Sequence, residues 1–160
     1  HQIRRKGDEL DVEIVPLGFP HVIAPWNWGR EGLRWRVRLN DSVPLSLALE
    51  TGASDAHLDL SELRVTDLRL ETGASSVRVI LPAHAGHTDA RIEAGAASVS
   101  VSVPPGVAAR IRAAGGLASI EVDRGRFPRT GAVFQSPDYE SAQNRVNLEI
   151  KAGVGSVEVR

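Results

Sequence analysis

Apolar and polar residues alternate along most of the chain, and the alternation restarts after each of five glycines. The copies read GASDAHLDL from Gly52, GASSVRVIL from Gly73, GAASVSVSV from Gly95, GLASIEV from Gly116 and GVGSVEV from Gly153. The first four glycines are 21 or 22 residues apart, and the fifth follows 37 residues later. Alternation with period two is typical of a strand with one buried face. A fixed repeat of this length is typical of a β-solenoid, in which each copy forms one coil.

Equivalent positions in the copies carry the same kind of residue. Four residues after the glycines come Ala56, Val77, Val99, Ile120 and Val157. A column of serines comes three residues after the glycines, at Ser76, Ser98, Ser119 and Ser156. The apolar columns predict inward faces, and the serines predict a hydrogen-bonding ladder. We expect strands at 45–50, 55–60, 67–71, 75–81, 89–94, 97–103, 109–113, 118–122, 145–151 and 155–159, with at most a turn or two of helix near 138–143.

The repeated glycine predicts a sharp corner between the two strands of each coil. Such a corner needs either a positive φ or a close approach of two backbones, and glycine satisfies both. The sequence leaves these two reasons open. Under either one, a β-branched residue at Gly73 should be poorly tolerated.

Charged residues form outward columns before the glycines. Arginines stand four residues before them, at Arg69, Arg91 and Arg112, and glutamates two residues before them, at Glu50, Glu71 and Glu93. Neighbouring coils are about 4.8 Å apart, so a bare glutamate ladder would repel itself. We interpret the two columns as a solvated salt-bridge lattice. The alternative, a cation site, lacks the Gly-rich loop of calcium-binding solenoids.

All seven aromatic residues lie outside the repeats. Four precede the first copy, at Phe19, Trp26, Trp28 and Trp35, and three lie in the insertion 123–144, at Phe127, Phe134 and Tyr139. Open solenoid ends need covering, so we interpret 8–44 as an N-terminal β cap with strands in DELDVEIV and GLRWRVRL. We expect the tryptophans to cover the first coil. The alternative is a patch that binds a partner.

The insertion 123–144 interrupts the regular stack, and the fifth copy ends at the last residue, Arg160. We therefore expect the fifth coil to be the free end of the stack, covered by the insertion aromatics. What stays exposed there should contact a protein partner or a second subunit of a homo-oligomer. The expected partner-binding residues are Trp26, Trp28, Arg30, Phe127, Arg129, Phe134 and Tyr139.

Composition narrows the function further. The 160 residues suit a single all-β domain, divided into the cap 8–44, regular coils 45–122, the insertion 123–144 and the last coil 145–160. A net charge of −1 argues against a nucleic-acid partner. No cysteine is present, no apolar run approaches the length of a membrane span, and no nucleophile elbow heads a strand. His84 and His87 lack a third ligand at a recognised spacing. We expect no catalytic residue, metal or cofactor.

Two long segments, VPLSLALETGASDAHLDLSELRVTDLRLETGASSVRVILP (43–82) and FQSPDYESAQNRVNLEIKAGVGSVEVR (134–160), resemble the toast-rack domain. That domain forms the C-terminal part of LiaF-like proteins, the "cell wall-active antibiotics response" family. The resemblance covers residues 30–160. It implies a β-stack domain of a bacterial cell-membrane protein that responds to envelope stress and restrains a membrane histidine kinase. The family offers no catalytic motif to carry over.

The resemblance and the residues together leave two functional hypotheses. The preferred one is a soluble, non-catalytic regulatory and interaction domain, joined to the membrane only through upstream helices. The chain starts at His1 without an initiator methionine, so we expect a native segment before it. The alternative is a structural adhesin or glycan-binding solenoid whose aromatic loops stack on sugars. The sequence does not specify the side of the membrane or the identity of the partner.

Overall fold

The computed structural model describes residues 2–6, 9–13, 36–52 and 55–160. These residues form strands and turns without any helix, and the chain divides into two units, His1–Val37 and Arg38–Arg160. In the first unit, β1 (Gln2–Lys6) and β2 (Glu9–Glu13) pair as an antiparallel hairpin. The strand expected in DELDVEIV is therefore confirmed as β2, whereas β1 was not expected.

The second strand expected in the cap is wrong over residues 36–39, which are exposed and unpaired with any described strand. A local turn follows, in which the Ser42 amide donates to Oδ1 of Asn40 at 2.8 Å and the Ser42 hydroxyl donates to Asp41. Such side-chain bonds offer the backbone an alternative to a ladder. The tryptophan cover of the first coil lies outside the described residues.

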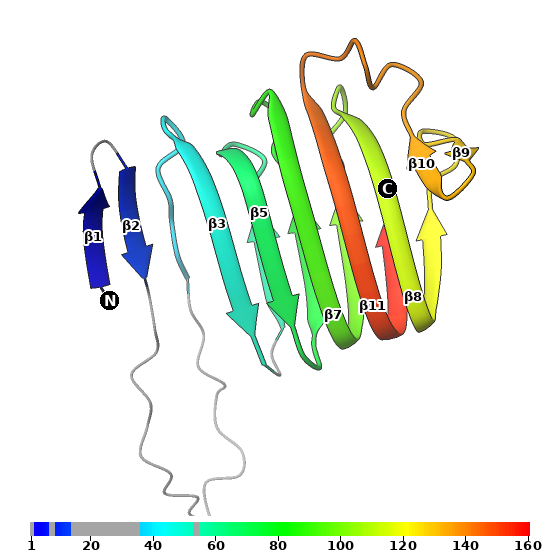
Figure 1. Cartoon of the computed structure of the whole chain (residues 1–160), viewed down its shortest axis with the longest axis horizontal. Helices are drawn as coiled ribbons and strands as arrows, with labels where there is room; N and C mark the ends of the chain where they lie inside the picture. The colour runs from blue at the N-terminus through cyan, green and yellow to red at the C-terminus, as the bar shows by residue number, and fades with distance from the viewer. Residues whose placement is uncertain (1, 7–8, 14–35, 53–54) are drawn as a thin grey trace, which may run out of the picture. The chain divides into compact units, whose positions relative to one another are not determined.

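The second unit is a stack of V-shaped coils with two layers of parallel strands (Figure 1). The first layer contains, in spatial order, β3 (Pro44–Thr51), β5 (Arg64–Thr72) and the first halves of β7 (His87–Ser102), β11 (Arg145–Val159) and β8 (Ala108–Val122). The second layer contains β4 (Ala56–Asp59), β6 (Ser76–Ile80) and the second halves of β7, β11 and β8. The all-β, solenoid-like stack expected from the repeat is confirmed.

The core lies between the two layers and is built from the inward columns. Val77, Val99 and Val157 are neighbours in register, and each is at most 2% exposed. The fully buried side chains include Leu68, Leu70, Ile92, Ile111, Leu148 and Ile150. Two buried threonines share the inward columns, Thr72 on β5 and Thr88 on β7, and the Thr88 hydroxyl donates to the Val65 carbonyl at 2.7 Å. That bond offsets the cost of removing the hydroxyl from water.

The fifth copy does not close the stack. Strand β11 pairs with β7 on one side and with β8 on the other over its whole length, so coil five lies between coils three and four. The expected free end at 155–159 is therefore wrong, and β8 forms the last coil. The serine column crosses this junction in register, and Ser156 Oγ bonds to Ser98 Oγ at 3.2 Å.

The insertion makes this order possible, because it carries the chain across the end of the stack before β11 begins. It contains β9 (Arg129–Thr130) and β10 (Val133–Gln135), and β10 pairs antiparallel with the first half of β8. Phe127 is fully buried in the core, and Phe134 packs against it from the edge. The insertion aromatics therefore cover the end of the stack as expected, but at coil four. Residues 138–142 form a hydrogen-bonded turn and no helix.

Close backbone approach, and not positive φ, explains the repeated glycines after the first one, Gly52. A Cβ on Gly73 would lie 3.0 Å from the Gly52 carbonyl oxygen, and one on Gly153 would lie 2.6 Å from that of Gly95. None of the five repeat glycines has a positive φ. Gly155 has both constraints: its φ is 127°, and an added Cβ would lie 2.0 Å from the Ala97 carbonyl oxygen. Only glycine fits at that point of β11.

Gly155→Ala should therefore destabilise the protein far more than Gly52→Ala. The strained φ and the backbone clash should together cost about 3 kcal/mol or more at Gly155. An added Cβ at Gly52 meets no atom within 4 Å. Urea unfolding followed by circular dichroism measures both variants, and equal midpoints would contradict the close packing of β11 on β7.

The order of the coils makes a second prediction. Val157 lies between two neighbouring coils and is 1% exposed, whereas Ile120 lies on the last coil and is 36% exposed. Val157→Ala should cost about 2 kcal/mol, and Ile120→Ala about 1 kcal/mol, although the isoleucine loses more carbon atoms. If coil five were at the free end, the ranking in thermal unfolding would be reversed.

Candidate functional site

A basic groove lies where the insertion meets the last coil. It is lined by Arg110, Arg112, Thr130, Val133 and Gln135, and its volume is about 270 Å³. The two arginines come from the outward face of β8, Thr130 comes from β9, and Val133 and Gln135 come from β10. We call this the end groove. None of the insertion residues that the sequence singled out lines it, although Arg129 and Phe134 are chain neighbours of its lining residues Thr130, Val133 and Gln135.

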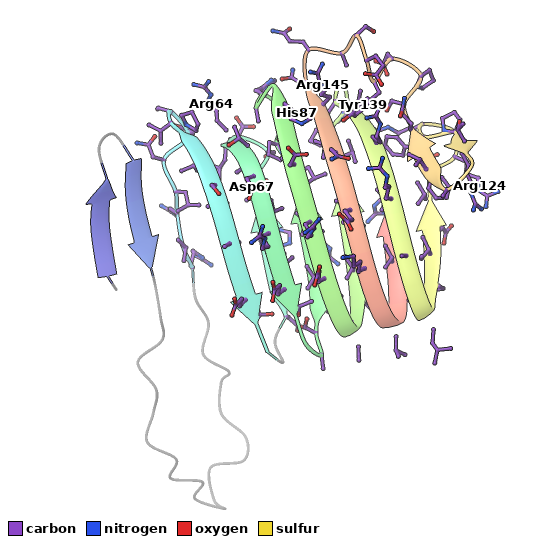
Figure 2. All side chains as sticks on the ribbon, in the orientation of Figure 1. Arg64, Asp67, His87, Arg124, Tyr139 and Arg145 are labelled. Atoms are coloured by element: carbon purple, nitrogen blue, oxygen red, sulfur yellow. The ribbon has the colours of Figure 1, made fainter. Side chains whose placement is uncertain are left out.

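Arg110 holds one side of the end groove in place. Its Nε donates to Gln135 Oε1 at 2.7 Å, and a terminal nitrogen donates to Glu140. Its guanidinium also lies 4.2 Å from the centre of the Tyr139 ring, within cation–π range. Tyr139 is 4% exposed, and burial raises the pKa of its hydroxyl although the nearby Arg110 charge lowers it. Tyr139 lies near Arg145, at the edge of the first layer where β11 begins (Figure 2).

Phe127 and Arg126 anchor the start of the insertion. Arg126 donates to the carbonyls of Val103 and Pro104 at 2.8 and 3.2 Å, and its guanidinium lies 4.9 Å from the Phe127 ring centre. Phe127 is therefore sealed inside the fold. The structure gives Phe127 and Tyr139 a packing role, so a partner would meet the residues around them.

Arg129 and Phe134 are the expected partner-binding residues that remain accessible. The Arg129 guanidinium lies 5.5 Å from the Phe134 ring centre, and its Nε donates to the Gly131 carbonyl at 2.9 Å. Arg112 is exposed, and within the described residues neither Arg112 nor Arg129 forms an ion pair. Trp26, Trp28 and Arg30 lie outside the described residues. Arg112 was missed as a site candidate because it belongs to the outward arginine column, which the repeat predicts to be part of a surface lattice.

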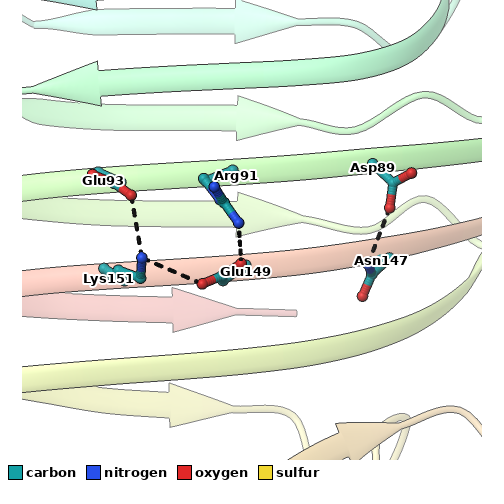
Figure 3. A network of polar contacts seen from close by, with 6 residues as sticks. All are labelled: Asp89, Arg91, Glu93, Asn147, Glu149 and Lys151. Carbon is teal, nitrogen blue, oxygen red and sulfur yellow. Dashed lines mark hydrogen bonds and ion pairs between the residues drawn. The ribbon is translucent and has the colours of Figure 1, made fainter.

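The outward face of the first layer carries that lattice, and coil five changes its sign pattern (Figure 3). Glu149 stands in the arginine column beside Arg91, and their 2.8 Å contact is an ion pair. Lys151 stands in the glutamate column and contacts Glu93 at 3.4 Å and Glu149 at 3.5 Å. Asn147 donates to Asp89 at 3.0 Å. The salt-bridge interpretation of the columns is thus supported by direct contacts.

A second depression follows the glycine corner. It has a volume of about 820 Å³ and is wide open to solvent, and the glutamate column Glu50, Glu71 and Glu93 lines it together with Lys151. No described group of three or more histidine, cysteine or carboxylate side chains is arranged to hold a metal ion. His87 instead contacts Asp89 at 3.4 Å. In the described part of the chain, no helix has the length and apolar character of a membrane span.

Comparisons with known proteins agree with this architecture. A family model described as the N-terminal domain of toast_rack, DUF2154, matches residues 16–102. No curated protein matches the sequence. Among solved structures, a Clostridium sporogenes protein described as a "putative cell adhesion protein" is similar, with a TM-score of 0.70 and 23% identity. The similarity covers 76% of this chain and 57% of that one, so this chain spans little more than half of its neighbour's length.

The family match covers more than half of the chain, and the chain therefore belongs to the toast_rack family. The resemblance found in the repeat sequence is confirmed by this match. The structural neighbour is too distant in sequence to show more than the fold. Its similarity nevertheless agrees with an all-β stack of this kind.

The Arg91–Glu149 pair makes a prediction about pH. The hydrogen bond from Arg91 is the main cause that holds the pKa of Glu149 below its ordinary value, and the same bond raises the pKa of Arg91. A lowered carboxyl pKa contributes stability above the ordinary value of about 4.3, and this contribution is lost as pH falls through the folded-state pKa.

Glu149→Gln should therefore lower the melting temperature at pH 7 and make no difference in strong acid. Melting curves of both proteins between pH 2 and pH 7 (roughly the range in which carboxylates titrate) measure the effect. Glu71→Gln is the matched control: Glu71 stands between Glu50 and Glu93 in register, so its neutralisation should not destabilise the protein at any pH. If the difference in melting temperature between wild type and Glu149→Gln stayed the same at every pH, the charge of Glu149 would not be the cause of the stabilisation.

Proposed function

From its membership of the toast_rack family, we propose that this chain is a non-catalytic interaction domain of a LiaF-like regulator of the bacterial envelope-stress response. Helices outside this chain hold the domain at the membrane. The observation that carries the proposal is the end groove, where Arg112 is exposed beside a two-layer stack and Arg129 is exposed on the adjoining strand β9. A rigid scaffold with charged residues on an inserted loop is a common design for a binding module.

The chemistry of the end groove favours an acidic protein segment as its ligand. Arginine presents several donors in a planar fork that matches a carboxylate, and it binds best where its position is already fixed. Arg110 is fixed by Gln135, Glu140 and the Tyr139 ring, so it shapes the wall of the groove. Arg112 then supplies the accessible charge within the groove, and Arg129 supplies a second one on the adjoining β9. The partner is the membrane histidine kinase that the regulator restrains.

A second candidate function is a surface adhesion module that binds glycans. The description of the Clostridium sporogenes neighbour favours it. Sugar rings stack on open aromatic faces. In the insertion, however, Phe127 and Tyr139 are buried and Arg129 lies over Phe134, so these aromatics are poorly placed for stacking. We therefore prefer the regulatory function.

Replacing Arg112 and Arg129 together by glutamine in the full-length protein should release the restrained kinase. We expect an envelope-stress reporter in unstressed cells to rise about as far as it does when residues 38–160 are deleted. Loss of two charge-assisted contacts should weaken binding by about tenfold or more. Protein abundance measured by immunoblot confirms that the variant accumulates normally.

Arg69→Gln is the matched control, because Arg69 occupies the same outward column as Arg112 but lies on β5, away from the end groove. It should leave the reporter silent. A silent reporter in the double variant would show that the end groove is not the contact. A silent reporter after the deletion would contradict the regulatory function itself, and binding of the purified chain to a glycan array would then support the adhesion module.

A further inference from the structure

The second half of β8, residues 117–122, is a strand edge without a described partner. In the second layer it pairs only with β11, among the strands that the structure describes. Strand β10 covers the first half of β8 and pairs only with Ile111 and Arg110. Exposed strand edges carry unpaired backbone donors and acceptors and invite another strand to join.

The other edges of the stack carry protective features that this one lacks. Strand β3 begins with Pro44 and has a register shift between Leu45 and Ser46, and β4 is only four residues long. Proline, bulges, short strands and lysines are the usual means of protecting an edge. Residues 117–122 read LASIEV, with no proline, lysine or register shift.

Large apolar side chains are exposed around the same edge. Leu117 is 82% exposed and Ile120 is 36% exposed, and Val154 on the neighbouring β11 is 51% exposed. Ile120 belongs to an inward column whose members Val77, Val99 and Val157 are buried in the inner coils. The last coil therefore leaves one side of that column open to water.

We propose that two copies of this chain dimerise by antiparallel pairing of residues 117–122, with the twofold axis at Ile120. In this register Ile120 stands opposite its symmetry mate, and Ala118 stands opposite Val122. All three belong to the inward face, so the core continues from one copy into the other. On the outward face, Ser119 of each copy stands opposite Glu121 of the other.

Charge also favours this register. Glu121 stands beside Glu158 in register, and like charges in that position repel each other. Glu158 contacts Arg160 at 3.6 Å, whereas Glu121 has no ion pair among the described residues. A serine hydroxyl from the second copy would donate to the Glu121 carboxylate. The register also keeps the two Glu121 carboxylates apart, because each faces Ser119.

The dimer should be weak and reversible, because one pair of short strands buries less surface than a stable complex requires. Sedimentation equilibrium of the 160-residue chain, from micromolar to millimolar concentration, should show a monomer–dimer equilibrium. A chain that stays monomeric over this range overturns the proposal.

Two substitutions at Ser119 test the register with opposite signs. Ser119→Glu places one carboxylate opposite each Glu121, so each dimer gains two repulsive pairs, and association should weaken by about threefold to tenfold. Ser119→Lys places one positive charge opposite each Glu121, so each dimer gains two attractive pairs, and association should strengthen by a similar factor. Ser119 is exposed, so neither change should prevent folding, and circular dichroism checks this.

Ser76→Glu and Ser76→Lys are the matched controls, because Ser76 occupies the same column on β6, inside the second layer and away from the edge. Neither should change the dimer dissociation constant. Weakening by both Ser119 variants would overturn the register, and indifference to both would overturn the location. The reporter result for the end groove is independent of these outcomes, since Ser119 does not line that groove.

Discussion

The position of β11 between β7 and β8 is the constraint on which the rest of the stack depends. Within the described strands, β8 contacts the other coils only through β11, and it does so over the length of both layers. The last fifteen-residue strand therefore joins coil four to the first three coils. Parallel in-register pairing propagates every column across this junction, so one inserted strand fixes the core, the serine ladder and the outward charges together.

The outward charges show why coil five fits there. Its Glu149 and Lys151 carry the opposite signs to Arg91 and Glu93 in the same columns, and both contact these residues of β7. A fifth coil with the usual signs would have placed like charges beside Arg91 and Glu93 and added repulsion to both columns. Backbone spacing favours the same neighbour, because a Cβ at Gly155 would lie 2.0 Å from the Ala97 carbonyl oxygen of β7, so β11 needs glycine there. Backbone packing and side-chain charge thus both favour β7 as a neighbour of β11.

The sequence predicts the strands well because each coil is specified by local alternation. The second-layer strands 75–81 and 155–159 were expected within a residue or so of β6 and of the end of β11. The sequence does not predict the order of the coils in space. The fifth copy along the chain lies between the third and fourth coils, so chain order and spatial order differ. The reversed signs at Glu149 and Lys151 were the available signal for the true neighbour. The sequence identified Arg129 and the aromatic residues of the insertion but none of the residues that line the end groove. Arg110 and Arg112 become distinctive only when β10 and β9 lie beside them.

The two ends of β8 show how one strand can serve two purposes. Its first half is covered by the insertion, which turns a repeat edge into a groove lined by Arg110 and Arg112. Its second half keeps the plain repeat sequence and an open backbone edge. A solenoid must end somewhere, and an insertion long enough to cross the end of the stack covers only part of the final coil. The uncovered part is therefore the place where a second chain can continue the stack without any change in the fold.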